Sequence, residues 1–220
     1  MILDNINSPK DLKTLNIEEM NILANEMREL IIKKVNTTGG HMAPNLGILE
    51  TTIALHYVFN STKDKFIFDV GHQCYTHKIL TGRSNKFSTL RQFGGIAGYQ
   101  KRVESEHDPF EAGHTSTSIA AALGFAYARD LNKEKYEVIA IIGDGSLTGG
   151  LAFEALNNID TLNSKVIIIL NDNAMYISKN VGGMSKFIKK IRISNSYDKA
   201  KENCKQFELT YTSKPFRYEY

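Results

Sequence analysis

The stretch VIAIIGDGSLTGGLAFEALNNI, residues 138–159, decides the fold of this chain. The apolar run over 137–142 predicts a buried strand, and the pattern over 150–159 predicts a helix. Between them, the Gly-Asp-Gly of residues 143–145 places a carboxylate between two glycines at the mouth of the strand. Two interpretations stay open at this point, because such a carboxylate can stabilise a tight turn or hold a cation.

The rest of the chain repeats this alternation of strands and helices. Short apolar runs predict strands at 66–70, 137–142 and 165–170. Amphipathic or alanine-rich stretches predict helices at 16–35, 48–59, 116–131 and 150–159. Asn16 and Glu19 have the spacing of a capping box at the first helix. Residues 37–47 and 82–116 are rich in glycine and polar residues and are predicted to be loops. Apolar strands separated by helices indicate an α/β fold: a parallel sheet with helices on both faces.

The composition is that of a soluble globular protein, 42% hydrophobic with a formal net charge of +3. Its 220 residues are enough for one well-filled core or for one and a half domains. No basic patch with interleaved aromatic residues points to nucleic acid, and no apolar run is long enough to span a membrane. Cys74 and Cys204 are far apart and lack metal-type spacing, which favours a reducing compartment. The first ten residues lack the pattern of a signal peptide. We therefore predict a cytoplasmic location.

Three predicted loops carry unusual residues after strands: DVGHQ (69–73), GDGS (143–146) and NDNAM (171–175). In an open parallel sheet, ligands bind at the carboxyl ends of the strands. Asp144 and an asparagine of the third loop therefore suggest a magnesium–diphosphate clamp, and the N-terminus of the following helix suits a phosphate. A dinucleotide fingerprint fails because Thr148 stands at its third glycine. A phosphate-binding P-loop is excluded because no Gly-Lys-Ser/Thr follows.

The Gly-Asp-Gly is separated by residues 146–170 from an Asn-Asp-Asn at 171–173. This order and spacing resemble the thiamine-diphosphate and magnesium motif of transketolase-like enzymes. Five further blocks narrow the resemblance to the N-terminal, diphosphate-binding domain of 1-deoxy-D-xylulose-5-phosphate synthases. They are GGHMAPNLGILETTIALHYVFN, FDVGHQCYTHKILTGR, RQFGGIAGYQKRVESEHD, GHTSTSIAAALGFA and NVGG. The blocks occur in the family's order between residue 10 and about residue 200. The resemblance implies the family's thiamine-diphosphate-binding α/β fold.

The resemblance also implies a metal site and a diphosphate site. Asp144, Asn173 and the main-chain carbonyl of Met175 would ligate Mg²⁺, and Asn173 would also contact the cofactor. Gly145 and Ser146 would contact the diphosphate of thiamine diphosphate.

Further residues would line the cofactor and the substrate. His72, Gly113, His114 and Thr115 would line thiamine diphosphate, and His41 would be a catalytic histidine near the substrate, placed for proton transfer. The histidines of these loops have glycine neighbours, where packing alone needs no imidazole. The other three histidines carry no such motif: we expect His56 to be structural or exposed, and His77 and His107 to be exposed.

The reaction implied by the resemblance condenses pyruvate with glyceraldehyde 3-phosphate, with loss of CO₂, to 1-deoxy-D-xylulose 5-phosphate. This product feeds isoprenoid, thiamine and pyridoxal synthesis. Family members are longer homodimers whose second, pyrimidine-binding domain carries the glutamate that activates the cofactor. We therefore expect a cofactor domain over 1–200, a divergent tail over 201–220, and no activity of this chain alone without that domain or a partner chain.

Two alternatives remain: one subunit of a split transketolase-like enzyme, or a non-enzymatic remnant that binds cofactor. Ala174 stands where relatives carry an acidic residue, and Tyr176 replaces a small residue, so the third loop departs from the family pattern.

Overall fold

The computed structural model describes residues 1–172, 182–183, 186–187 and 190. The chain divides into two units, Met1–Asn171 and Asp172–Tyr220. The domain boundary expected at residue 200 lies outside the described residues. No helix in the described part of the chain is long and apolar enough to cross a membrane.

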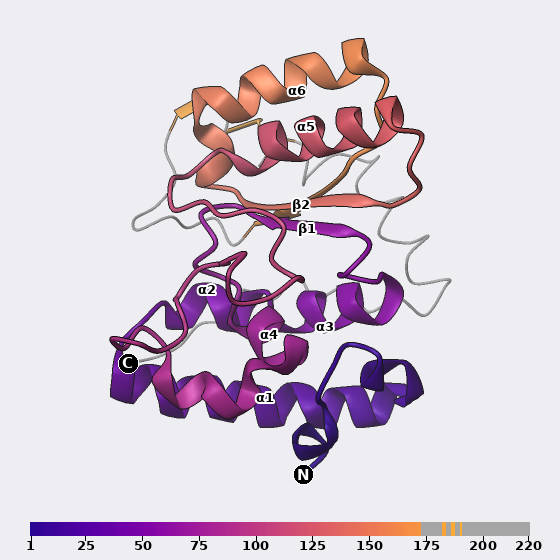
Figure 1. Cartoon of the computed structure of the whole chain (residues 1–220). Helices are drawn as coiled ribbons and strands as arrows, with labels where there is room; N and C mark the ends of the chain where they lie inside the picture. Colours follow the sequence, from indigo (N-terminus) through magenta and orange to yellow (C-terminus); the bar gives the residue numbers. More distant parts are fainter. Residues whose placement is uncertain (173–181, 184–185, 188–189, 191–220) are drawn as a thin grey trace. The chain divides into compact units, whose positions relative to one another are not determined.

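The centre of the first unit is a parallel sheet of strands β1 (Lys65–Phe68), β2 (Val138–Gly143) and β3 (Ile167–Asn171), in the order β1-β2-β3 (Figure 1). Lys65 pairs with Val138 at one end of the sheet, and Gly143 pairs with Asn171 at the other. The first five residues of β2 are buried, as expected for a strand covered on both faces. The predicted parallel sheet is therefore confirmed.

Helices cover both faces of this sheet, as predicted (Figure 1). Helix α5 (Ser118–Leu131) packs on β1 and β2, and α6 (Gly150–Leu162) packs beside α5. Both helices follow a strand and precede its parallel neighbour, so the right-handed rule for such crossovers puts them on one face. Helix α3 (Leu49–Val58) lies on the opposite face. A cluster of buried apolar side chains joins α3, the sheet and the segments next to them: Ile48, Leu55, Phe66, Phe68, Cys74, Ile139 and Ile141.

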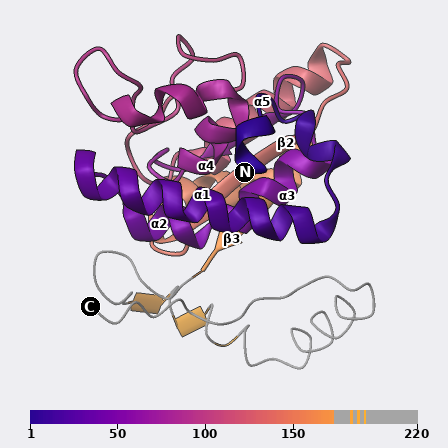
Figure 2. The same ribbon diagram turned by 90° about the horizontal axis from the view of Figure 1, so that it is seen from below.

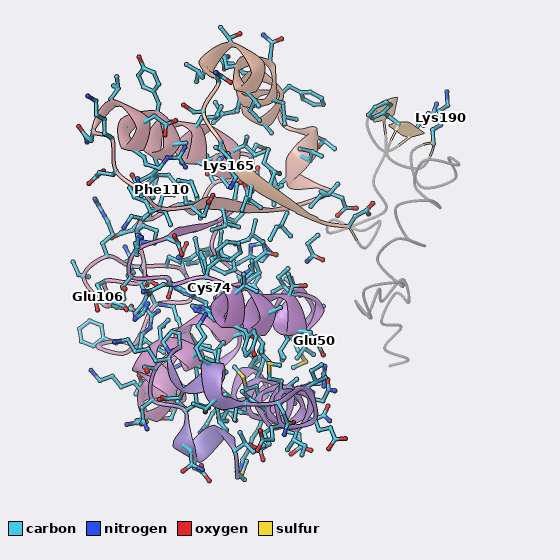
Figure 3. The ribbon with its side chains drawn as sticks, turned by 90° about the vertical axis from the view of Figure 1, so that its right-hand side faces the viewer. Glu50, Cys74, Glu106, Phe110, Lys165 and Lys190 are labelled. Atoms are coloured by element: carbon cyan, nitrogen blue, oxygen red, sulfur yellow. The ribbon has the colours of Figure 1, made fainter. Side chains whose placement is uncertain are left out.

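Helix α1 (Ile17–Thr38) lies outside this second layer, as Figure 2 shows from below. Its start is the predicted capping box. Asn16 Oδ1 accepts from the main-chain N–H of Glu19 at 2.9 Å, and Glu19 Oε2 accepts from that of Asn16 at 2.8 Å. Apolar side chains of α1 belong to a second buried cluster, which also contains Tyr75 and Phe87. The N-terminal third of the chain is thereby fixed to the layer that carries the loop after β1.

Two predicted loops contain short helices. Within 37–47 the chain forms α2 (Met42–Gly47), whose Pro44 is tolerated because it occupies the first turn. Within 82–116 a 3-10 helix forms at Ser84–Thr89. Helix α4 (Tyr75–Lys78) is a single turn. These elements are too short to produce a periodic apolar pattern, which is why the sequence did not reveal them.

The outer edge of β1 is occupied by a side chain in place of a neighbouring strand. Gln100 Oε1 accepts from the main-chain N–H of Phe68 at 3.3 Å, and Gln100 Nε2 donates to the carbonyl of Phe66 at 3.1 Å. Gln100 is buried. The long irregular segment before α5 is thus attached to the sheet at a defined register.

The expectation that His77 is exposed is wrong, and His56 is buried as well. His56 Nε2 lies 2.9 Å from His77 Nδ1, and His77 Nε2 lies 2.8 Å from Asp108 Oδ1. Burial is the main cause that lowers the pKa of His77 to about 4, and the pKa of His56 also lies well below its ordinary value. His107 is half-buried, with its Nδ1 2.6 Å from the Ser61 hydroxyl oxygen.

An arginine completes this buried network. Arg83 donates to both carboxylate oxygens of Asp108, at 2.6 and 2.9 Å. Lys78, also buried, pairs with Glu104 at 2.6 Å. Contacts with Arg83 and His77 hold the pKa of Asp108 well below its usual range, although burial opposes them. The network joins the segment after β1 to the irregular segment before α5. His77, a histidine without a motif, serves here as a packing group whose two ring nitrogens both have partners.

Candidate cofactor site

The loops that follow β1 and β2 lie together at the carboxyl edge of the sheet, as predicted. The main-chain N–H of Asp69 donates to Ile141 at 2.8 Å, and that of Asp144 donates to Asn171 at 3.2 Å. Each loop therefore leaves the sheet beside its neighbouring strand. Asn173 and Met175, expected in the third loop, lie outside the described residues.

Asp69 ties the loop after β1 to the start of α5. Its carboxylate is buried, and Oδ1 accepts from the main-chain N–H of Ser116 at 2.9 Å while Oδ2 accepts from that of Ser118 at 3.0 Å. The first N–H groups of a helix have no partner within the helix and attract a negative charge. Asp69 therefore fixes the segment that leads from Gly113 into α5.

Ser116 extends this tie to the loop after β2. Its hydroxyl donates to the main-chain carbonyl of Ser146 at 2.7 Å, and its φ of +71° is unusual for a residue with a side chain. A Cβ at Gly149 would overlap with the Ser116 hydroxyl, so glycine is required there for the close approach. Asp69, Ser116 and Ser146 thus connect three loops in one chain of hydrogen bonds.

Asp144 lies in the same loop as Ser146, directly after β2, with only 3% of its surface exposed. The glycines beside it are not needed for the backbone conformation. Gly145 has φ −65°, and a Cβ on Gly143 would meet its nearest neighbour, the carbonyl of Asn171, at an ordinary 4.0 Å. The interpretation of the Gly-Asp-Gly as a turn that demands glycine is therefore unsupported. A close approach of a ligand to this backbone remains as a reason for glycine.

Two of the predicted histidines lie together. His41, at the start of α2, and His72, in the loop after β1, place their ring centroids 5.1 Å apart in an edge-on arrangement. Tyr99 lies next to them, 6.2 Å from the His41 ring. The Nδ1 atoms of both histidines are buried and have no hydrogen-bond partner in the part of the chain that the structure describes. Leaving such an atom unpaired costs about 1–3 kcal/mol, so packing alone does not explain two imidazoles here.

Both histidines are held in the neutral form. Burial, and then the neighbouring His41, lowers the pKa of His72 to about 4, although Asp69 acts in the opposite direction. Burial and the positive charge of Arg91 lower the pKa of His41. At neutral pH each ring can therefore donate one hydrogen bond and accept another.

Gly113 and His114 are exposed, and Thr115 is half-buried. The Nδ1 atom of His114 lies 2.9 Å from the carbonyl oxygen of Thr115. Gly113 has φ +144°, a conformation that other residues rarely adopt. Gly145 is half-buried and Ser146 is buried. The structure thus places His114 on an open surface, whereas His41 and His72 are half-buried.

No group of three or more His, Cys, Asp or Glu side chains among the described residues is arranged to hold a metal ion. Mg²⁺ is usually bound through one or two carboxylates, with phosphate and water completing its shell. The buried carboxylate of Asp144, the unpaired histidine nitrogens and the glycines without a conformational need are what a bound diphosphate cofactor would use.

Comparison with known proteins decides the family. The family model of 1-deoxy-D-xylulose-5-phosphate synthase matches residues 3–218. The chain belongs to this family. The synthase of Caldanaerobacter subterraneus is 60% identical over 201 residues, and that of Alkaliphilus oremlandii is 59% identical over 198. These matches cover 91% and 90% of this chain but 32% of each relative, so the chain spans about a third of the length of these synthases.

Solved transketolase structures show the same fold. Transketolase from Leishmania mexicana superposes with a TM-score of 0.63 at 21% identity, over 77% of this chain and 30% of that one. A transketolase mutant from Pichia stipitis gives 0.58 at 23% identity, over 70% and 27%. At this identity the likeness concerns the fold alone. The synthase family and the transketolase-like α/β fold are therefore as predicted.

The sequence did not reveal which residues hold the site together. Asp69, Ser116 and Asn45 lie inside the blocks that resemble the synthase family, but their contacts are with residues distant along the chain. The only sequence signal was their position beside the predicted loops. Asp144 stands out from the sequence because it follows a strand and lies between two glycines.

Proposed function

We propose that this chain provides the diphosphate and magnesium half of the active site of a 1-deoxy-D-xylulose-5-phosphate synthase. The observation that carries the proposal is the junction of three loops at the carboxyl edge of the sheet, tied by Asp69, Ser116 and Ser146, with the buried Asp144 in the loop after β2. Membership of the synthase family supports the same assignment.

Each expected site residue takes a role within this proposal. Asp144 binds Mg²⁺ together with Asn173 and the carbonyl of Met175, and Asn173 also contacts the cofactor. Gly145 and Ser146 approach the diphosphate through their main chain. A hard cation with few protein ligands and a diphosphate is the arrangement that magnesium favours.

The remaining residues surround the organic part of the cofactor and the substrate. His72, Gly113, His114 and Thr115 line thiamine diphosphate, and His41 transfers protons at the substrate. The cofactor, when bound, supplies the electron sink for the carbon–carbon chemistry. The half-buried position and lowered pKa of His41 support its proposed role in proton transfer, because an imidazole that is neutral at neutral pH can take up a proton.

The reaction of the complete enzyme is the condensation of pyruvate with glyceraldehyde 3-phosphate to 1-deoxy-D-xylulose 5-phosphate, with loss of CO₂. The activating glutamate of the family has no counterpart assigned among these 220 residues. We therefore propose that the chain needs a pyrimidine-binding domain, in its own continuation or in a partner chain, and that the assembly is a homodimer acting in the cytoplasm. A split enzyme and a cofactor-binding remnant remain as alternatives.

Calorimetry of thiamine diphosphate binding, with and without Mg²⁺, tests this proposal. Asp144→Ala should weaken the magnesium-dependent binding at least about tenfold, or about 1.4 kcal/mol. Asp130→Ala is the matched control, because Asp130 is an exposed carboxylate near the end of α5, remote from its start at the site. Equal affinity of wild type and Asp144→Ala would refute the metal assignment.

An activity assay separates the alternatives. With pyruvate, glyceraldehyde 3-phosphate, thiamine diphosphate and Mg²⁺, the chain alone should give no product. Addition of a pyrimidine-binding domain from a relative should restore product formation if the chain is half of an enzyme. Cofactor binding without such restoration would favour the remnant. Turnover by the chain alone would contradict the need for a second domain.

A further inference from the structure

Asn45 on α2 is fully buried, and its carboxamide contacts the main chain of three other residues. Nδ2 donates to the carbonyl of His41 at 2.6 Å and to that of His72 at 2.8 Å. Oδ1 accepts from the main-chain N–H of Tyr75 at 2.8 Å. Both carboxamide hydrogens and the oxygen are therefore engaged, and two of the three partners are the backbone groups of the paired histidines.

A carboxamide is well suited to this position. It offers two donors and an acceptor on one short side chain, which neither a carboxylate nor a hydroxyl does. Aspartate would direct a negative charge at two carbonyl oxygens. Leucine would leave two carbonyls and one N–H of the main chain without this partner in a buried region, where unpaired polar groups are costly. Asn45 thus meets a chemical requirement and does more than fill space.

A second contact supports the same two segments. Tyr75 Oη accepts from the main-chain N–H of His41 at 3.2 Å. Gly40, with φ +145°, makes room for it, since a Cβ there would lie 2.6 Å from Tyr75 Oη. The Tyr75 ring is itself fixed edge-on against Phe87, with centroids 5.9 Å apart. The backbone around His41 is therefore held by both Asn45 and Tyr75.

We propose that Asn45 is a positioning residue, which holds the segments of His41 and His72 so that their imidazoles meet edge-on at 5.1 Å. It acts through the main-chain carbonyls of the two histidines. The proposal deepens the proposed function and rests on it for the use that the histidines have. The arrangement of the rings is nevertheless measurable without cofactor.

The test follows the histidine rings of the full chain by NMR as the pH is lowered. In the wild type, the pKa of His72 is about 4 because the ring is buried beside His41 and only Asp69 favours its charged form. The pKa of His41 is lowered by burial and by Arg91. In Asn45→Ala the two segments lose their common partner, so the pKa of His72 should rise toward an ordinary 6.5.

Two further variants make the test specific. Asn45→Ser keeps one hydroxyl donor for the two carbonyls and should give a pKa of His72 between those of wild type and Asn45→Ala. Asn158→Ala is the matched control, because this exposed asparagine also donates to a main-chain carbonyl, that of Glu154, but on α6. The control should leave both histidine titrations unchanged.

Unchanged titrations of both histidines in folded Asn45→Ala would overturn the proposal, even if the variant were less stable, because lost stability alone indicates only a structural role. If Asn45→Ala does not fold, the same comparison is made with Asn45→Ser: unchanged titrations of His41 and His72 in that folded variant would overturn the proposal. Failure of the proposed function has a different signature: the wild-type chain would show no magnesium-dependent cofactor binding, while the dependence of the histidine titrations on Asn45 would remain.

Discussion

The carboxylate of Asp69 lies 2.9 Å from the main-chain nitrogen of Ser116, and both groups are buried. This contact joins the end of β1 to a segment 47 residues further along the chain. Because Ser116 in turn binds the loop after β2, the contact sets the relative position of loops that the sequence leaves independent. It is therefore the first contact to test.

Replacing Asp69 with asparagine should destabilise the protein. The amide can still accept one of the two N–H bonds, but its NH₂ group then faces the other N–H. Loss of a charge-assisted hydrogen bond at a buried site costs about 1.5–3 kcal/mol, which urea denaturation can measure. Asp11→Asn is a suitable control, since its half-buried carboxylate also accepts two main-chain N–H groups, and a smaller loss is expected there. Equal losses at both positions would argue against a special role for Asp69.

Gly149→Ala should also destabilise the protein, because the new methyl group overlaps with the Ser116 side chain. Overpacking of this kind typically costs about 1–3 kcal/mol. The double variant Gly149→Ala/Ser116→Gly should recover part of this loss, because it removes the overlapping atoms and places glycine where φ is +71°.

Gly150→Ala serves as the control for that pair of variants. A Cβ at Gly150 meets nothing within 4 Å, so the substitution should be neutral or slightly stabilising. Thermal unfolding of the wild type, Gly149→Ala, Ser116→Gly, the double variant and Gly150→Ala gives the comparison. Additive effects of Gly149→Ala and Ser116→Gly would contradict the close approach.

Asp108→Asn should be among the most destabilising single substitutions, because it removes the charge that compensates the buried Arg83. Breaking a buried ion pair from one side costs about 3–5 kcal/mol. The pair of Arg129 with the exposed Asp130 provides the contrast. Asp130→Asn should cost less than about 1 kcal/mol, because Asp130 is exposed to water and Arg129 keeps its hydrogen bonds to the carbonyls of Tyr136 and Lys165. Denaturant midpoints that are the same for both variants would show that the buried network contributes little.

Acidification should weaken the fold before the carboxylates titrate. The pKa of His77 is about 4 in the folded chain and about 6.5 when the chain is unfolded, so the unfolded chain binds more protons between these values. Stability is therefore complete above pH 6.5 and falls as the pH drops toward 4. His56, whose pKa is also lowered, acts in the same direction.

The measurement is the free energy of unfolding at several pH values between 7 and 4. His77→Gln removes one titrating group, so its free energy of unfolding should depend less steeply on pH in this window. The difference in slope corresponds to the uptake of about one proton at most on unfolding. The lowered pKa of Asp108 adds a further loss only at more acidic pH, below its ordinary value. A slope that is the same in wild type and His77→Gln would contradict the buried, neutral state of His77.

The order of strands and helices was predictable because each main element carries its own apolar pattern. The apolar strands β1, β2 and β3 are continuous runs, and Asn16 with Glu19 marks the start of α1. The carboxyl-edge position of Asp144 followed directly from the strand before it. Such features depend on neighbours within a few residues, and a sequence reveals them.

Contacts across the chain were not predictable in the same way. His77 reads as an ordinary exposed histidine until Asp108, 31 residues later, is seen to bind it. Asn45 reads as a loop residue until its carboxamide is seen between His41 and His72. These side chains are defined by partners that only tertiary packing brings near, so composition and periodicity carry no sign of them.

Gln100 has a consequence for the behaviour of this chain among its own copies. The free edge of a strand offers N–H and C=O groups to which a strand of another molecule can add, and this is a common origin of aggregates. On β1, the N–H of Phe68 and the carbonyl of Phe66 are already bonded to Gln100. An incoming strand would have to displace a buried side chain and the segment attached to it. One glutamine thereby closes this edge of the sheet to polymerisation.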